Sequence, residues 1–232
     1  MSLPLFLVDA LPPADRFTLD GPEGHHAANV QRLSVGEALL LGDGRGAQAR
    51  AVVLAARKGA LDLAVEAPTF TPAADPSITV VQGIAKGERA ELAVQLLTEV
   101  GADRIVPWPA ARSIPRWKDA KPLERWRSTA REAAKQSRRA WLPEVTPACP
   151  TRQLSLSGTV LVLHEEASTP LSAVPLPSTG SITLVVGPEG GVAPEELEAL
   201  AGTAVRLGPE VLRTSTAGAA AVAALSVRLA RW

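Results

Sequence analysis

Two patterns of apolar residues follow one another along the chain. Up to about residue 67, short runs of β-type residues lie between turn signals, which is typical of a small β-barrel or sandwich. The predicted strands are residues 5–8, 38–41, 49–56 and 61–65. Asp43-Gly44-Arg45-Gly46 falls between the second and third of these strands and predicts a hairpin turn there.

A proline-rich segment, residues 68–76, separates the two patterns. Three prolines in nine residues exclude a helix or a central strand. Beyond it, strands alternate with helices, which predicts a mostly parallel α/β sheet. The predicted strands are 78–84, 105–107, 159–163, 182–186 and 205–207, and the helices are 88–100, 122–139, one starting at Pro194, and 216–229. We therefore expect two domains, residues 1–70 and 76–232.

The overall composition excludes some classes of protein but does not indicate a binding partner. The 24 Lys and Arg balance the 24 Asp and Glu, so any electrostatic specialisation must be local. The single Cys149 excludes a disulfide framework and suits a reducing, cytoplasmic compartment. The N-terminus lacks the pattern of a signal peptide, and prolines break the longest uncharged stretch, so we expect no membrane span.

Residues 104–139 carry a local excess of positive charge. They contain eleven Lys and Arg against three acidic residues, and Trp108, Trp117, Trp126 and Trp141 lie in or beside the same stretch. Arginine with aromatic side chains is what a phosphate backbone and an unstacked base require, so the stretch could bind RNA or DNA. It could equally be a solvated basic helix whose Trp126 packs inward.

The segment Gly187-Pro188-Glu189-Gly190-Gly191 comes directly after the apolar run 182–186. Glycines where a strand ends let the backbone approach a ligand at the carboxyl edge of a sheet, although a plain tight turn would have the same composition. Residues 163–166 and 207–214 also follow predicted strands and could converge on the same crevice. The chain has no Gly-x-Gly-x-x-Gly fingerprint, P-loop or Gly-x-Ser-x-Gly elbow. Its three histidines lack metal-ligand spacing, so no metal is expected.

In this order and spacing, several motifs resemble those of one family. They are His26 to Arg32, Gly36 to Gly44, Lys86-Gly87, Thr98 to Gly101, Arg112-Ser113, Glu132 to Arg138, Pro143 to Val145, Leu184 to Gly191 and Leu207 to Thr216. Over most of its length the chain resembles the RsmE family of 16S ribosomal RNA uridine-N3 methyltransferases, in the SPOUT superfamily. The resemblance implies a PUA-like β-barrel followed by an α/β domain whose C-terminal end forms a trefoil knot.

The resemblance also implies S-adenosylmethionine as cofactor, a homodimer, and 16S rRNA or the small ribosomal subunit as partner. Carried over residue by residue, the cofactor contacts are Leu163, His164, Glu165, Gly187, Glu189, Gly190, Leu207, Gly208, Leu212, Arg213 and Thr214. The RNA contacts are Arg32, Lys86, Arg112, Ser113, Gln136 and Arg138.

Methyl transfer to uridine N3 requires that the proton of this weak acid be removed or its anion stabilised. Arg138, Lys86 and Arg213 are the candidate catalytic cations, and Glu132 or Glu189 could accept the proton. Ser215 stands where the family commonly has an acid, and we expect it to cap the last helix. Two other hypotheses are open: a non-catalytic RNA-binding protein of ribosome assembly, and a metabolic enzyme that holds a nucleotide cofactor on the glycine-rich loop.

Overall fold

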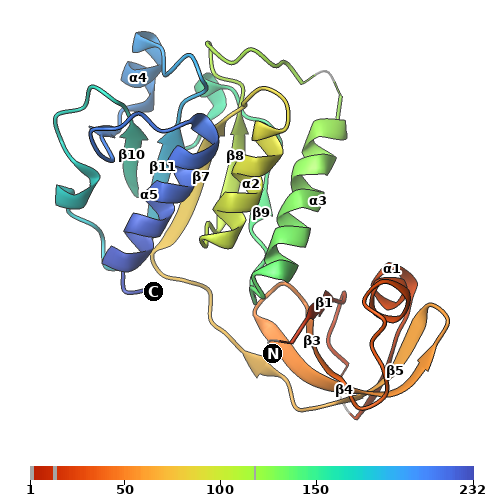
Figure 1. Cartoon of the computed structure of the whole chain (residues 1–232). Coiled ribbons are helices and arrows are strands. Elements are labelled where there is room, and N and C mark those ends of the chain that lie inside the picture. Colours follow the sequence, from red (N-terminus) through yellow and green to blue (C-terminus); the bar gives the residue numbers. More distant parts are fainter. Residues whose placement is uncertain (1–2, 13–14, 118) are drawn as a thin grey trace. The chain divides into compact units, whose positions relative to one another are not determined.

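The computed structural model describes residues 3–12, 15–117 and 119–232 (Figure 1). The chain divides into two compact units. The first comprises Met1–Ala73 with Ala134–Leu142, and the second comprises Ala74–Ala133 with Pro143–Trp232.

The first unit is built on one six-stranded sheet. Its strands lie in the order β1-β3-β4-β5-β2, with β6 paired to β4, and every pairing except the parallel pair β1 and β3 is antiparallel. In chain order the elements are β1 (Leu5–Leu7), β2 (Arg16–Leu19), α1 (Gly21–His25), a π-helical turn (His26–Val30), β3 (Ala38–Gly42), β4 (Ala47–Arg57), β5 (Ala60–Val65) and β6 (Thr69–Phe70). Alternate residues of these strands, among them Leu39, Leu41, Leu61 and Leu63, are buried in one core.

The predicted hairpin between β3 and β4 is confirmed. One carboxylate oxygen of Asp43 accepts hydrogen bonds from the amides of Arg45 and Ala47, at 2.7 and 3.1 Å, and Gly44 and Gly46 supply positive φ angles. The sequence patterns missed β2, where only Leu19 is buried, and the helical segment from Gly21 to Val30. A five-residue helix containing two glycines has no apolar periodicity to detect.

Residues 134–142 complete the first unit. The indole N–H of Trp141 donates to the carbonyl of Thr71 at 2.8 Å, and its ring packs edge-on against Phe70. The buried ammonium of Lys135 pairs with the carboxylate of Glu23 at 3.1 Å. This segment therefore belongs to the first unit by packing, although it lies far from residues 1–73 in the chain.

The second unit contains a six-stranded, wholly parallel sheet in the order β12-β10-β11-β7-β8-β9. Its elements are β7 (Ser77–Gly83), α2 (Arg89–Glu99), β8 (Arg104–Trp108), α3 (Lys121–Gln136), β9 (Glu144–Val145), 3-10 turns at Thr151–Gln153 and Leu171–Ala173, β10 (Thr159–Leu163), β11 (Ser181–Val186), α4 (Pro194–Leu200), β12 (Thr203–Val205) and α5 (Thr214–Arg228). The end of α3, from Ala134 onward, belongs to the first unit. The predicted parallel α/β class is confirmed.

Both faces of this sheet are covered. On one face, α2, α3 and α5 pack over Ile78, Val80 and Leu184, and Figure 1 shows α2 and α5 side by side. On the other face, Leu200 of α4 joins Val81 and Val185 in a smaller core. Burial on both faces explains why the strand sequences are continuous apolar runs.

Three predicted boundaries in this unit were wrong. The helix predicted to reach residue 139 ends at Gln136, and Arg138 then has a positive φ of 55°. The strand predicted at 205–207 occupies Thr203–Val205, which places Leu207 in a loop. The last helix starts at Thr214, two residues earlier than predicted. In the part of the chain that the structure describes, no helix is both long enough and apolar enough to span a bilayer.

Candidate functional site

One pocket is lined by the loops that follow three neighbouring strands of the second unit. It has a volume of about 610 Å³ and lies where β10, β11 and β12 end. Parallel strands bring their carboxyl ends to one edge of a sheet, where α/β folds usually bind ligands. The lining includes all the residues expected to contact the cofactor: Leu163, His164, Glu165, Gly187, Glu189, Gly190, Leu207, Gly208, Leu212, Arg213 and Thr214.

Glycine is required in the loop after β11 by close packing. A Cβ atom on Gly187 would stand 3.0 Å from a methyl of Val192, and one on Gly190 would stand 3.1 Å from Cβ of Arg112. Gly83, at the end of β7, passes even closer, since its Cβ would lie 2.5 Å from the backbone nitrogen of Pro188. The loop thus packs tightly between the segments that contain Gly83 and Arg112, and this packing fixes the backbone groups that face a ligand.

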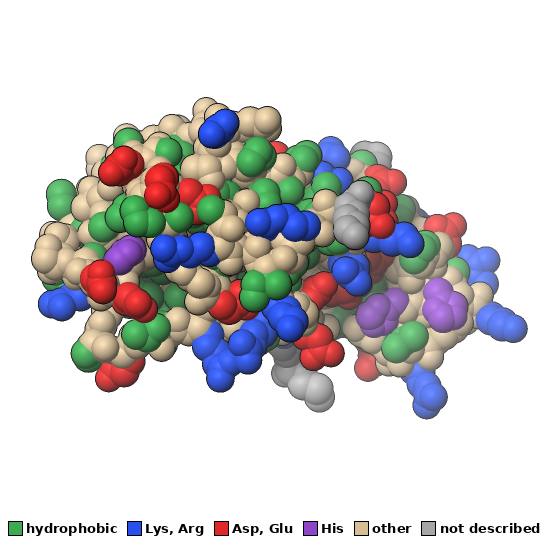
Figure 2. All heavy atoms as spheres, turned by 90° about the horizontal axis from the view of Figure 1, so that it is seen from above, with side chains coloured by type: hydrophobic (Ala, Val, Ile, Leu, Met, Phe, Trp, Pro, Cys, Tyr) green, Lys and Arg blue, Asp and Glu red, His purple; other side chains and the backbone are tan. Residues whose placement is uncertain are grey.

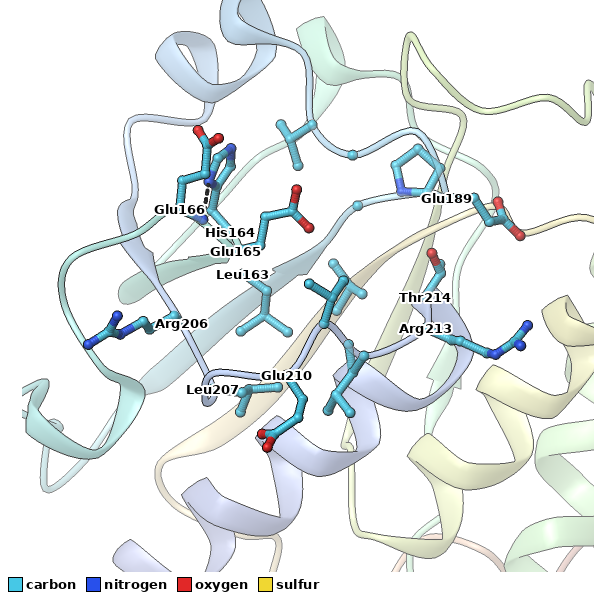
Figure 3. A pocket seen from close by; sticks show the side chains of 18 of the residues that line it. Leu163, His164, Glu165, Glu166, Glu189, Arg206, Leu207, Glu210, Arg213 and Thr214 are labelled. Carbon is cyan, nitrogen blue, oxygen red and sulfur yellow. Dashed lines mark hydrogen bonds between the residues drawn. The ribbon is translucent and has the colours of Figure 1, made fainter.

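His164 has a defined hydrogen-bonding state in the loop after β10. Its backbone amide donates to the carbonyl of Val205 at 2.9 Å, and its Nδ1 accepts the amide N–H of Glu166 at 3.3 Å (Figure 3). Because Nδ1 accepts, the neutral ring carries its proton on Nε2. Nε2 is then available as a donor, and the two acids that follow the histidine belong to the same lining.

The third loop leads from β12 into α5. Leu207, like Leu163, is half-buried and packs against the core beneath the sheet edge, so these side chains give the pocket an apolar floor. The N-cap of α5 is Arg213, without a side-chain capping bond. Ser215 is buried within the first turn, so the expectation that it caps this helix was wrong.

Charges of both signs surround the apolar floor. The acids are Glu165, Glu166, Glu189 and Glu210, and the bases are Arg89, Arg112, Arg206 and Arg213. Figure 3 shows the side chains of Arg206 and Arg213 directed outward on opposite sides of the pocket. The sequence reasoning did not include Arg89 and Arg206 in the site. Arg89 is the first residue of α2, which follows β7, and this position at the carboxyl edge of the sheet could have indicated that it lines the pocket.

The residues expected to contact RNA are divided between the two units. Arg112 is exposed, lines the pocket, and donates from Nη1 to the carbonyl of Gly190 at 3.1 Å. Lys86 is exposed, and its backbone amide donates to Oε1 of Glu189 at 3.1 Å. Ser113 is buried. Arg32, Gln136 and Arg138 belong to the first unit and are all exposed.

The tryptophans of the basic stretch are largely structural. Trp108 and Trp126 are no more than 1% exposed, and the half-buried Trp117 packs edge-on against Trp126 with ring centroids 5.3 Å apart. The inward packing of Trp126 is therefore the correct interpretation, and an aromatic stacking surface built on it is not. Trp141 packs within the first unit.

Several basic side chains of the stretch have acidic partners. Arg104 pairs with Glu144 at 3.2 Å, and Arg125 pairs with Glu91 at 3.5 Å. Lys118 lies outside the described residues. The space-filling view accordingly shows basic and acidic side chains mixed across the visible face (Figure 2). Among the residues with described positions, no three His, Cys, Asp or Glu side chains are grouped as a metal site would need.

Comparisons with protein-family models agree with the two-part organisation of the chain. A family model described as RNA methyltransferase domain matches residues 73–226, and one described as RNA methyltransferase PUA domain matches residues 19–66. The chain is thus an RNA methyltransferase by class, with a PUA domain preceding the methyltransferase domain, as the resemblance implied.

Curated relatives and solved structures narrow the class. Ribosomal RNA small subunit methyltransferase E of Mycobacterium bovis is 48% identical over 98% of this chain and 93% of that protein. Its namesake in Bacillus subtilis is 32% identical over 92% and 90%. The Neisseria gonorrhoeae structure of that name, bound to S-adenosyl methionine, has a TM-score of 0.88 at 28% identity and covers 98% of both chains. A Legionella pneumophila methyltransferase in complex with the same cofactor has a TM-score of 0.87 at 26% identity, again over 98% of both chains. The chain belongs to the ribosomal RNA small subunit methyltransferase E family.

Proposed function

We propose that this protein transfers a methyl group from S-adenosylmethionine to N3 of a specific uridine in the 16S RNA of the small ribosomal subunit. The observation that carries the proposal is one pocket at the edge of the parallel sheet, whose lining includes every expected cofactor residue. An intact pocket of this kind favours an enzyme over a non-catalytic RNA-binding protein of ribosome assembly.

The pocket residues fit the proposed cofactor. A volume of about 610 Å³ lies in the range of small-molecule sites. Leu163 and Leu207 would cover the faces of the adenine ring, while backbone groups of the glycine-rich loop would hydrogen-bond its polar edge. Nε2 of His164 would donate toward the ligand, and the mixed charges would hold the amino and carboxylate groups of the methionine part.

The bound cofactor supplies an electrophilic methyl group on a sulfonium. In the proposed reaction the N3 lone pair forms the new N–C bond, the C–S bond breaks with its electrons going to sulfur, and the N3 proton leaves to a base. Lys86 and Arg213 of the second unit are proposed to stabilise the negative charge on the uridine. Arg138, in the first unit, is a candidate for this role from the family resemblance alone. Glu189, which lines the pocket, is a better placed proton acceptor than Glu132, which is outside the lining.

RNA recognition is assigned to both units. We propose that Arg32, Gln136 and Arg138 of the first unit and Lys86 and Arg112 of the second contact the RNA. The side chain of Ser113 is buried, so it is not proposed as a contact. We propose the expected domains, 1–70 and 76–232, as the two main segments of the chain, with residues 134–142 packed in the first unit. A trefoil knot in the C-terminal part, a homodimer and a cytoplasmic location are also our proposals.

Calorimetric titration with S-adenosylmethionine, with NAD as the control ligand, tests the cofactor. Saturable binding of the methyl donor alone is expected, and binding of NAD alone would favour a metabolic enzyme. Incubation with labelled donor and either free 16S rRNA or the small subunit then tests the reaction. Label at uridine N3 is expected, whereas cofactor binding without label on either RNA would contradict the proposed activity.

A further inference from the structure

A buried carboxylate lies behind the glycine-rich loop. Glu196, in the first turn of α4, is only 7% exposed. Its Oε1 accepts two hydrogen bonds, one from the amide N–H of Ala111 at 2.9 Å and one from the hydroxyl of Thr151 at 2.7 Å. The indole N–H of Trp108 donates to the same hydroxyl at 3.0 Å. Glu196 thereby connects α4 to two segments that are distant from it in the chain.

The segment held by Glu196 continues directly into the pocket. Arg112 follows Ala111, and its Nη1 donates to the carbonyl of Gly190 at 3.1 Å. A Cβ on Gly190 would stand 3.1 and 3.6 Å from Cβ and Cδ of Arg112, so the side chain lies along this glycine. Residues 111–112 are therefore hydrogen-bonded to both ends of the stretch 190–196. Arg112 binds Gly190 at its start, and Ala111 binds Glu196 at its end.

Hydrophobic packing does not explain the choice of glutamate. Burying a carboxylate is costly unless it is well partnered, and Oε2 of Glu196 is buried without a hydrogen-bond partner among the described residues. An apolar side chain would avoid that cost. What only an acceptor can provide is a partner for the Ala111 amide, which would otherwise be left unsatisfied.

We infer that Glu196 is a positioning residue: by holding Ala111 it keeps Arg112 against Gly190 and so fixes the loop that receives the cofactor. The inference rests on the proposed function for the identity of the ligand. Arg112 would then serve the cofactor site as well as the RNA.

Substitutions at Glu196 distinguish the role of its hydrogen-bond acceptor from the role of its negative charge. Glu196→Ala should weaken S-adenosylmethionine binding about tenfold, because two hydrogen bonds are lost and a buried amide is orphaned. Glu196→Gln keeps the acceptor oxygen and should stay within about twofold of the wild type. Glu195→Ala, an exposed acid in the same turn, is the matched control and should bind as the wild type does. Affinities are measured by calorimetry on the full chain, with thermal melts as the test of folding.

A double-mutant cycle tests whether Glu196 acts through Arg112. In an Arg112→Ala background, Glu196→Ala should cause no further loss of affinity. An equal loss in both backgrounds, or wild-type affinity in Glu196→Ala, would overturn the inference. If Glu196→Ala does not fold, Thr151→Val replaces it in the cycle, with a smaller loss expected only when Arg112 is present.

Hydrogen exchange of the cofactor-free protein provides a readout that needs no ligand. The Ala111 amide should exchange faster in Glu196→Ala than in the wild type and as slowly as the wild type in Glu196→Gln. Unchanged exchange in Glu196→Ala would overturn the positioning role. If the wild type binds no S-adenosylmethionine, the proposed function fails on its own, and the exchange rates still decide whether Glu196 fixes this segment.

Discussion

The glycine-rich loop 187–191 and the basic stretch 104–139 both concentrate unusual residues over a short length of chain. The loop meets two other strand-end loops in one pocket, because parallel strands force their carboxyl ends to a common edge. The stretch forms a strand, a connecting segment and a helix, and many of its side chains are used internally, as Trp126 and Lys135 are. A local cluster in the sequence predicts a site well only when the fold holds its residues together in space.

The largest effect is expected where the basic stretch contributes to the core. Trp126→Ala should lower the free energy of unfolding by about 3 to 5 kcal/mol, since it empties a fully buried indole site beneath α3. Urea denaturation followed by circular dichroism measures this loss. The milder Trp126→Leu, which removes the aromatic ring but keeps an apolar side chain, should fold and should bind 16S rRNA as the wild type does. Weakened RNA binding with unchanged stability would restore the stacking hypothesis.

The next effect concerns the glycine-rich loop itself. Gly190→Arg should reduce S-adenosylmethionine affinity by at least about a hundredfold, or about 2.7 kcal/mol, because the new side chain would compete with Arg112 for the pocket wall. Gly190→Ala adds a single carbon 3.1 Å from Cβ of Arg112 and should cause a much smaller loss. Calorimetric titration compares the three proteins. Equal affinities for wild type and Gly190→Arg would remove this loop from the cofactor site.

Gly83 supports the same loop from behind. Gly83→Ala places Cβ 2.5 Å from the nitrogen of Pro188 and 2.8 Å from the carbonyl carbon of Gly187, and backbone atoms cannot move aside easily. The substitution should cost about 1 to 3 kcal/mol of stability and should also weaken cofactor binding. Gly218→Ala, which meets only side-chain atoms at 3.1 to 3.2 Å, is the matched control. Thermal melts and titrations that rank Gly218→Ala as the worse variant would contradict this account.

The elements and the pocket loops could be predicted because their signals are local. Apolar runs such as 182–186 mark buried strands, and glycines directly after them mark the edge where ligands bind. The buried partners could not be predicted in the same way. Lys135 finds Glu23, and Glu196 finds Ala111 and Thr151, only after the chain has folded, and no periodicity encodes such pairs. Ser215 was misassigned because helix ends are set by tertiary packing as much as by capping preference.

The smallest effect is expected for an exposed charge of the basic stretch. Arg104 and Glu144 form an exposed pair, with 49% of the Arg104 side chain and 66% of the Glu144 side chain accessible, so Arg104→Gln should change the free energy of unfolding by no more than about 1 kcal/mol. The substitution has a second, chemical consequence at Cys149. Burial raises the pKa of this thiol, while the positive charge of Arg104 lowers it in part, so removing the charge moves the pKa further up. The thiolate is the reactive form, and its fraction at a fixed alkaline pH should therefore fall. Alkylation of Cys149 in the folded protein, followed by mass spectrometry as the pH is raised, should accordingly be slower in Arg104→Gln. Faster alkylation, or a loss of stability as large as that of Trp126→Ala, would mean that Arg104 holds local structure rather than acting only as a surface charge.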